Sequence, residues 1–391
     1  MPRNWPPSIP VALAYVLFAA SLSITGCRDG GAGGPGQKSD EIVIGEVGSM
    51  TGSEASFGVS THEGIELALK QLNDKGGIKG KRVRLVSLDN QGKPEESATA
   101  VTRLITRDKV VAVLGEVASS GSLAMAPIAQ RFKVPMISPA STNPRVTQVG
   151  DYVFRVCFID PFQGAVMSSF ALNNLKLTKV AILKDMRSDY SMGLSQAFVD
   201  HFTRAGGQIL VEQSYSGGDM DFKSQLTAVR ALKPEAIFVP GYYSEVGLIA
   251  RQMRELGIEV PLLGGDGWDS PKLTEIGQQA IEGSYFSNHY SAQDQSERVQ
   301  KFLSEYKASY GTQPDALAAM GYDAAGVLFD ALSRVSDFNS QEIRDQIAST
   351  KGFPGVTGTI TIDENRNAQK PAVVLKVENG QFVYQTTVEP T

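Results

Sequence analysis

The chain has 391 residues, which is long enough for two domains of ordinary size, each with its own hydrophobic core. Its composition is that of a globular protein. The formal net charge of -5 argues against a nucleic-acid partner, because the phosphate backbone attracts basic surfaces.

The N-terminal segment has the pattern of a secretion signal. Arg3 supplies a positive charge, and the apolar stretch Val11–Ile24 is too short for a transmembrane helix. The stretch ends on Thr25-Gly26-Cys27, which resembles a bacterial lipobox, in which Cys27 would become the lipidated first residue. We therefore expect a lipoprotein signal peptide over residues 1–27 and a flexible Gly-rich tether over residues 28–40. The alternative is an ordinary signal peptide that contains a cysteine by chance.

Strands and helices alternate from Glu41 onward. The expected strands are Ile42–Gly45, Val83–Leu88, Val110–Leu114 and Val134–Ser138. The expected helices are Val59–Asn73, Pro94–Arg107 and Ser119–Phe132, with a loop over Gly48–Gly58. This order predicts a doubly wound, mostly parallel sheet that binds its ligand at the carboxyl ends of the strands.

A second series of the same kind predicts a second α/β lobe. Its expected strands are Val180–Leu183, Ile209–Glu212, Ala236–Val239 and Leu262–Leu263. Its expected helices are Ser191–Ala205, Phe222–Leu232 and Glu245–Leu256. The chain is expected to cross between the lobes near Asp151–Pro161 and again near Gly283–Tyr290.

The last third of the chain is expected to return to both lobes. Helices Ser296–Tyr310 and Pro314–Ser336 have no strand between them and are expected to pack on the first lobe. Three strands are expected in the tail, over Gly358–Ile362, Ala372–Val377 and Phe382–Thr387, and Glu378-Asn379-Gly380 predicts a hairpin turn between the last two. The first lobe would thus comprise residues 41–158 and 290–362, and the second residues 159–289 and 363–391.

Motifs for phosphate binding, metal binding and catalysis are missing from the sequence. Neither GxGxxG after a strand nor GxxxxGK[ST] occurs, and no GxSxG elbow is found. The histidines His62, His201 and His289 lie far apart without cysteine neighbours, so we expect exposed or capping roles for them. We expect no catalytic residue, no cofactor and no metal. Cys157 lies in an apolar stretch and is expected to be a buried, unreactive thiol.

Polar and aromatic residues gather where the predicted strands end. They are Ser119, Ala140 and Thr142 of the first lobe, Asp160 at the first crossing, and Tyr190, Tyr242 and Asp266 of the second lobe. The serines ahead of the helix that begins near Ser119 are expected to cap its N–H groups and, with the helix dipole, to hold a small anion.

Together these residues describe a pocket for a zwitterionic amino acid. The hydroxyls would bind the carboxylate of the ligand, and the two acids would bind its ammonium group. The aromatic rings would contact its side chain. Each acid also has a simpler explanation, since Asp160 before Pro161 could be a helix N-cap and Asp266 could be a turn residue.

The sequence resembles the leucine/isoleucine/valine-binding proteins, the solute receptors of bacterial ABC importers, over Glu41–Val388. The residues that carry the resemblance include Met50-Thr51-Gly52, Asn73–Gly80, Ser119-Ser120, Ser138–Pro144, Arg155 with Asp160, Asp189-Tyr190 and Gly241-Tyr242. The resemblance implies the fold of the type I periplasmic binding proteins: two doubly wound, Rossmann-like α/β lobes joined by hinge crossings.

The resemblance also implies roles for the matching residues. Ser119 and Thr142 would hold the α-carboxylate of the ligand, while the Ala140 carbonyl and Asp160 would receive the α-ammonium. Asp266 stands where relatives carry a glutamate. Phe57 would line the side-chain pocket, which Tyr190 and Tyr242 would close from the second lobe. The first-lobe disulfide of the family is absent, because Gly92 and Ala118 stand where its cysteines would be.

The implied function is capture of a free amino acid, with Leu, Ile or Val first, and its delivery to an ABC permease. The protein would be a monomer, lipid-anchored at the periplasm or outer cell surface of a bacterium, with no nucleic-acid partner. One alternative is a receptor of the same fold for an amide, urea or aromatic acid. A second is a ligand sensor for a signalling partner, and an enzyme is a distant third.

Overall fold

The computed structural model describes residues 41–390. The predicted signal peptide over residues 1–27, with its lipidation site Cys27, and the tether over residues 28–40 lie outside this range. Within residues 41–390, no helix combines the length and the apolar character needed to cross a membrane.

The first sheet is parallel, with the strand order β2-β1-β3-β4-β5. Its strands are β1 (Glu41–Gly48), β2 (Arg82–Asp89), β3 (Val113–Leu114), β4 (Met136–Ser138) and β5 (Val153–Arg155). The helices between them are α1 (Ala55–Asp74), α2 (Pro94–Thr106), α3 (Ser119–Phe132) and α4 (Arg145–Gln148). Because the order reverses between β1 and β3, the loops after these strands open a crevice at their carboxyl ends.

The second sheet repeats this plan and adds a hairpin, in the order β15-β14-β10-β9-β8-β6-β7. Its strands are β6 (Lys179–Asp185), β7 (Gln208–Tyr215), β8 (Ala236–Phe238), β9 (Leu262–Gly264), β10 (Tyr285–Asn288), β14 (Ala372–Glu378) and β15 (Gln381–Val388). Its helices are α5 (Asp160–Ser169), continued by a π-helical turn over Phe170–Asn174, α6 (Asp189–Arg204), α7 (Lys223–Ala231), α8 (Tyr243–Glu255) and α9 (Pro271–Gly277). The predicted hairpin turn is confirmed: β14 and β15 are antiparallel, and Asn379 and Gly380 both have positive φ.

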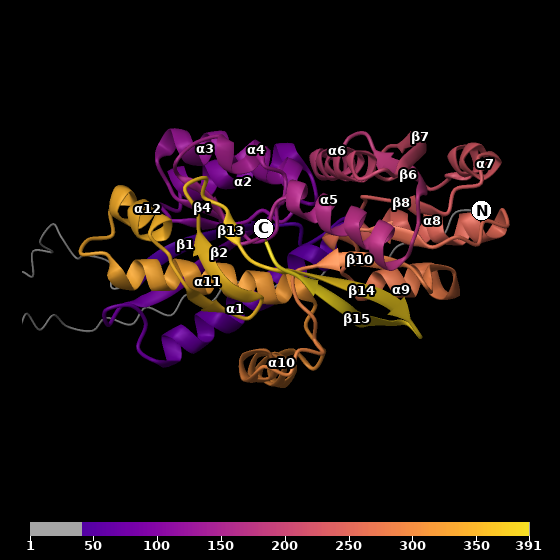
Figure 1. The fold of residues 1–391 in the computed structure, drawn as a ribbon. Helices are drawn as coiled ribbons and strands as arrows, with labels where there is room; N and C mark the ends of the chain where they lie inside the picture. The colour runs from indigo at the N-terminus through magenta and orange to yellow at the C-terminus, as the bar shows by residue number, and fades with distance from the viewer. Residues whose placement is uncertain (1–40, 391) are drawn as a thin grey trace, which may run out of the picture. The chain divides into compact units, whose positions relative to one another are not determined.

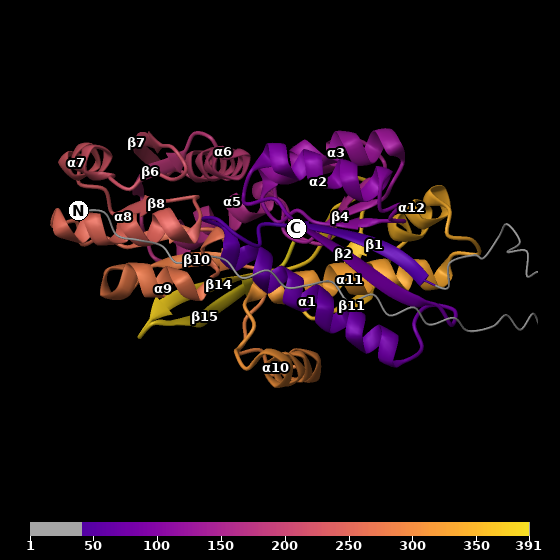
Figure 2. The ribbon, with the colours of Figure 1, turned by 180° about the vertical axis from the view of Figure 1, so that it is seen from behind.

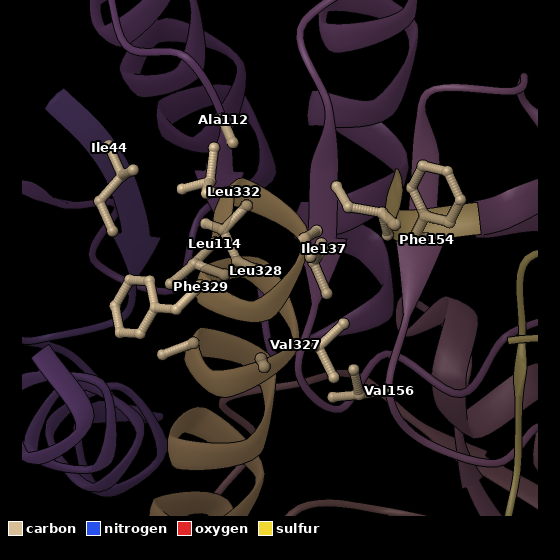
Figure 3. Packing of buried hydrophobic residues seen from close by; sticks show 14 of the residues in the cluster. Ile44, Ala112, Leu114, Ile137, Phe154, Val156, Val327, Leu328, Phe329 and Leu332 are labelled. Atoms are coloured by element: carbon tan, nitrogen blue, oxygen red, sulfur yellow. The ribbon is translucent and has the colours of Figure 1, made fainter. Parts of the chain in front are cut away.

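The first sheet has a helical layer on each face. Residues next to each other in a strand point to opposite faces, so Leu114 and Ile137 face α1 and α11 (Ala316–Arg334), while Val113 and Met136 face α2 and α3. Figure 3 shows Leu328 and Leu332 of α11 against the strand residues of this core. The expectation that the long helix near residues 314–336 packs on the first lobe is confirmed.

Helices α1 and α11 lie side by side in both views of the ribbon (Figures 1 and 2). Two glycines allow this close approach. A Cβ at Gly64 would lie 1.9 Å from the carbonyl oxygen of Ala318, and a Cβ at Gly321 would lie 2.3 Å from that of Thr61. The pairing places the first turns of both helices, which carry Phe57 and Leu317, at the same cavity.

Several predicted elements differ from the structure at their ends. The predicted strand Val110–Leu114 is shorter, with only Val113–Leu114 paired, and α1 begins within the expected loop, at Ala55. The expected strand Gly358–Ile362 is confirmed as β12 (Gly358–Ile362). Elements that were not predicted include α12 (Ser340–Ala348) and the two strands that pair with β12 in a small antiparallel sheet, β11 (Phe353–Gly355) and β13 (Ala368–Gln369). Helix α10 spans Glu297–Tyr310. The chain passes from the first large sheet to the second after β5. It leaves the second sheet after β10 for α10, α11, α12 and the small sheet, and it returns to the second sheet between β13 and β14.

Candidate functional site

Two neighbouring loops of the first sheet carry the predicted carboxylate-binding residues. Strands β3 and β4 pair in parallel, with Leu114 opposite Ile137, so the loops that follow them lie together. The Ser119 hydroxyl accepts a hydrogen bond from the backbone N–H of Asn143 at 3.3 Å and ties the loops to each other. Ser119, Ala140 and Thr142 are all buried.

The prediction that serine side chains cap α3 is wrong. Ala118 occupies the N-cap position, and no side chain accepts a hydrogen bond there. The serine hydroxyls have other partners: that of Ser122 donates to the carbonyl of Glu116 in the preceding turn at 2.9 Å, and that of Ser120 donates to Asp189 of α6 at 2.9 Å. The start of α3 thus presents its N-terminal end without a capping side chain, which leaves the favourable end of the helix dipole for an anion.

Three aromatic rings lie in contact near the starts of helices that follow the strands of the two large sheets. Tyr190, in the first turn of α6, stacks on Tyr242 with ring centroids 5.2 Å apart and an interplanar angle of 8°. Phe57, in the first turn of α1, meets Tyr242 edge-on with centroids 5.3 Å apart. The Tyr190 hydroxyl accepts a hydrogen bond from the Gly267 N–H at 3.1 Å, which fixes the ring against the turn after β9.

A small cavity lies at this meeting point. It is lined by Phe57, Val117, Ser119, Ala140, Tyr190, Tyr242, Asp266, Gly267 and Leu317. Six of the eight predicted ligand-binding residues are among them. Val117, Gly267 and Leu317 were not predicted from the sequence. Val117 and Gly267 are neighbours of predicted residues and could have been found. Leu317 reaches the cavity only because α11 returns to the first sheet, for which the local sequence carries no signal.

Thr142 and Asp160 are not part of the cavity wall. They are linked to each other by a 2.9 Å hydrogen bond from the Asp160 N–H to the Thr142 carbonyl. Both carboxyl oxygens of Asp160 and the hydroxyl of Thr142 are buried without a hydrogen-bond partner among residues 41–390. Burial raises the pKa of Asp160 to about 8; the charge of Asp266 adds to this rise, and the charge of Arg155 opposes it. The suggestion that Asp160 is a helix N-cap is wrong, since Ile159 holds that position.

Asp266 is held from both sides. It begins a short 3-10 turn after β9, and its Oδ1 accepts from Gln163 Nε2 at 2.8 Å. Its Oδ2 lies 2.9 Å from Nε2 of His289, whose side chain has no solvent exposure. The expectation that His289 is exposed or caps a helix is therefore wrong. Neither Gln163 nor His289 was singled out from the sequence, because both lie far along the chain from Asp266.

A second, larger cavity adjoins the first at Tyr242 and is strongly acidic. Glu54 and Glu116 lie on its first-sheet side, and Asp185 and Glu245 on its second-sheet side. Burial raises the pKa of Glu116 to about 7. Lys93 and Arg187 line the same cavity, so its carboxyl groups are not its only ionisable side chains.

Cys157 is a free, buried thiol, as expected. Burial raises its pKa to about 12, so it carries no thiolate at neutral pH and is a poor nucleophile.

Comparison with known proteins identifies the family. Residues 41–381 match the family described as periplasmic binding protein. The chain belongs to this family. Among curated proteins it is similar to the Leu/Ile/Val-binding protein homolog 3 of Brucella melitensis, with 28% identity over 88% of this chain and 93% of that protein.

Solved structures agree on the fold. The leucine binding protein LivK from Thermotoga maritima is 45% identical with a TM-score of 0.86, covering 89% of this chain and 99% of that one. The branched-chain amino acid binding protein LivJ from Streptococcus pneumoniae, solved with isoleucine, is 34% identical with a TM-score of 0.85, covering 90% and 100%. This periplasmic binding protein thus has the type I fold that the sequence predicted.

A further relative binds a different ligand. The solute binding protein of an ABC transporter from Rhodopseudomonas palustris, solved with 3,4-dihydroxybenzoic acid, is 26% identical with a TM-score of 0.81 and covers 90% of this chain and 98% of that one. Membership of the family therefore does not identify the ligand of this chain, which has to be inferred from the residues of the site.

Proposed function

We propose that this protein binds a free aliphatic amino acid, of the Leu, Ile or Val type, between its two lobes and delivers it to the permease of an ABC importer. The observation that carries the proposal is the buried carboxyl of Asp160, which has no hydrogen-bond partner among the described residues. A buried carboxylate is costly unless a positive or donating group meets it, and the α-ammonium of an amino acid is such a group.

The rest of the site suits the other parts of an amino acid. Ser119, the unpartnered Thr142 hydroxyl and the uncapped start of α3 offer donors for an α-carboxylate. Phe57, Val117, Tyr190, Tyr242 and Leu317 offer a mainly apolar wall for a side chain. We propose these residues, with Ala140 and Asp266, as the ligand contacts. The apolar wall favours an aliphatic side chain, with loose discrimination, since one methylene is worth about 1–3 kcal/mol.

We further propose that the chain acts outside the cytoplasm, as a monomer anchored through a lipid on Cys27. The support is the sequence of residues 1–27 and the membership of a family of periplasmic solute receptors. A Cys27→Ala variant would then be released into the soluble fraction, whereas equal retention at the membrane by both forms would contradict the anchor.

A thermal-shift screen against the common L-amino acids and simple amides and acids tests the ligand. A ligand at a hundred times its Kd adds about 2.7 kcal/mol to the free energy of unfolding. We expect leucine, isoleucine or valine to give the largest shift, with one molecule bound per protein and no turnover. No response to any amino acid, with a clear response to a compound that lacks the α-amino group, would overturn the proposal.

The second candidate is a receptor for an aromatic acid. The Rhodopseudomonas relative and the cluster of Phe57, Tyr190 and Tyr242 favour it. An aromatic acid has no ammonium group, so it would leave Asp160 without a partner. Benzoate and 3,4-dihydroxybenzoate in the same screen separate the two candidates.

A further inference from the structure

Asp266 contributes a second carboxylate to the cavity, and its surroundings differ from those of Asp160. Each oxygen of Asp266 is met by a different side chain, Gln163 at 2.8 Å and His289 at 2.9 Å. A carboxylate oxygen can accept two hydrogen bonds, so each keeps one acceptor position for a ligand. Asp266 also lines the cavity.

His289 acts on Asp266 as a hydrogen-bond donor. Burial lowers the pKa of His289, so its ring is neutral at pH 7 and carries one proton. Since a carboxylate only accepts, the proton lies on Nε2, which faces Asp266. The ring is held by stacking on Phe158, with centroids 4.0 Å apart. His289 directly follows β10, where the chain leaves the second sheet.

Gln163 reaches Asp266 from the helix that carries Asp160. The two residues are three positions apart in the first turn of α5 and therefore share a face. Gln163 is fully buried, and the amide oxygen that it turns away from Asp266 has no partner among the described residues. The charge of Asp266 is close enough to Asp160 to raise its pKa. The carboxyl groups of Asp160 and Asp266 thus lie near each other, and no Lys or Arg side chain of residues 41–390 forms an ion pair with either.

We propose that Gln163 and His289 are positioning residues: they hold the Asp266 carboxylate at the cavity, and through it they set the preference for ligands that carry an α-ammonium group. The inference rests on the proposed function and deepens it, because it names the residues that select the charged group of the ligand. Without these two donors, the Asp266 side chain would be free to turn away from the ammonium.

Binding of two probes that differ only in the α-amino group tests this inference. The probes are leucine and 4-methylpentanoate, and titration calorimetry on the purified protein gives both Kd values. Loss of a hydrogen bond to a charged group lowers affinity by about tenfold or more. We expect His289→Leu and Gln163→Met each to weaken leucine binding by about tenfold, and to change 4-methylpentanoate binding less than about threefold.

Two further variants serve as controls. His289→Gln keeps a donor at the position of Nε2 and should restore leucine binding to within about threefold of the parent. His62→Leu removes a histidine that bonds Glu46 outside the site and should leave both affinities unchanged. If His289→Leu does not fold, as its thermal unfolding would report, Gln163→Met carries the test.

The outcomes separate this inference from the proposed function. If both probes weaken equally in His289→Leu and Gln163→Met, or if leucine binding is unchanged in them, the positioning role is wrong while the proposed function stands. If the parent protein does not prefer leucine over 4-methylpentanoate, the proposed function is wrong and this inference fails with it.

Discussion

At the scale of single residues, Asp160 is the most informative side chain of this protein. Its position after an apolar strand and before Pro161 marks it in the sequence, but a capping role was equally possible there. The structure removes that role, because Ile159 is the N-cap and the buried Asp160 carboxyl has no hydrogen-bond partner in the part of the chain that the structure describes. Burial also raises the pKa of this carboxyl, so ligand binding should change its protonation state.

Replacing Asp160 with asparagine should weaken leucine binding by about 2–4 kcal/mol, which corresponds to about 30- to 1000-fold in Kd. The reason is the loss of a buried charge that meets the α-ammonium. Titration calorimetry on the parent and the variant measures the difference. Equal affinity in both proteins would show that Asp160 does not receive the ammonium.

Leucine binding should release a proton near pH 7. The pKa of Asp160 is about 8 without ligand, so the carboxyl is mostly protonated at pH 7, and the ammonium of the ligand favours its ionised form. Affinity should therefore rise from pH 6 to pH 8 and then level off. Titration calorimetry in buffers of different ionisation enthalpy measures the number of protons released per leucine bound. The count should fall to near zero in Asp160→Asn, and an unchanged count there would assign the proton to another group, such as Glu116.

The raised pKa of Asp160 also makes the free energy of unfolding depend on pH. The folded pKa of Asp160, about 8, exceeds the usual value of about 3.9 for an unfolded chain, so the stability it contributes is complete below pH 4 and is lost as the pH rises to 8. Without ligand, Asp160→Asn should have the higher free energy of unfolding at pH 8.5, and the gap should shrink towards pH 5. Urea unfolding at both pH values measures it, and a gap independent of pH would contradict the assignment.

At the scale of elements, the predictable parts are those with strong local patterns. The helices near Pro94 and Ser119 and the hairpin at Asn379-Gly380 follow from periodicity, proline and turn residues, and they are found within a few residues of their predicted ends. The prediction that serines cap α3 was wrong, because the Ser122 hydroxyl bonds to Glu116 in the preceding turn and the Ser120 hydroxyl bonds to Asp189 of α6. Helix α12 was missed, and its first turn is capped by Asn339.

The contact between α1 and α11 shows how one element positions another at the site. Alanine usually stabilises a helix by about 1 kcal/mol relative to glycine. Gly64→Ala should instead lower the free energy of unfolding by about 1–3 kcal/mol, because its Cβ would meet the backbone of Ala318. Urea denaturation measures this change. Ser333→Ala, on the exposed face of α11, should change it by less than about 0.5 kcal/mol, and an equal effect of both would contradict the close packing.

At the scale of the whole molecule, the two large sheets share one topology, and side chains from both close the site. Asp189, at the start of α6, connects the two sides. It bonds to Ser120 of α3 at 2.9 Å, to the side-chain amide of Asn143 through its carbonyl at 2.8 Å, and to Arg145 at 3.0 Å. The Arg145 pair is largely exposed and contributes little.

Removing the Asp189 carboxylate should loosen the closed arrangement. We expect Asp189→Ala to weaken leucine binding by about 1 kcal/mol, or about fivefold, mainly through faster release, because the hydrogen bond from Ser120 and the exposed ion pair with Arg145 are both lost. Stopped-flow displacement measures the release rate. Asp200→Ala, at an exposed position of the same helix, should leave the rate unchanged, and identical behaviour of the two variants would argue against a closing role.

The sequence by itself determined the two doubly wound lobes, the strand ends at which a ligand would sit and most of the residues around the cavity. These follow from local order: alternating strands and helices force a parallel sheet, and its carboxyl ends gather the loop residues. Only the tertiary structure decided the partners of those residues. Gln163 and Asp266 lie 103 positions apart, and Leu317 enters through a returning helix, so no local pattern predicts their contacts. Burial, which gives Asp160 its unusual pKa, likewise exists only once the lobes have packed.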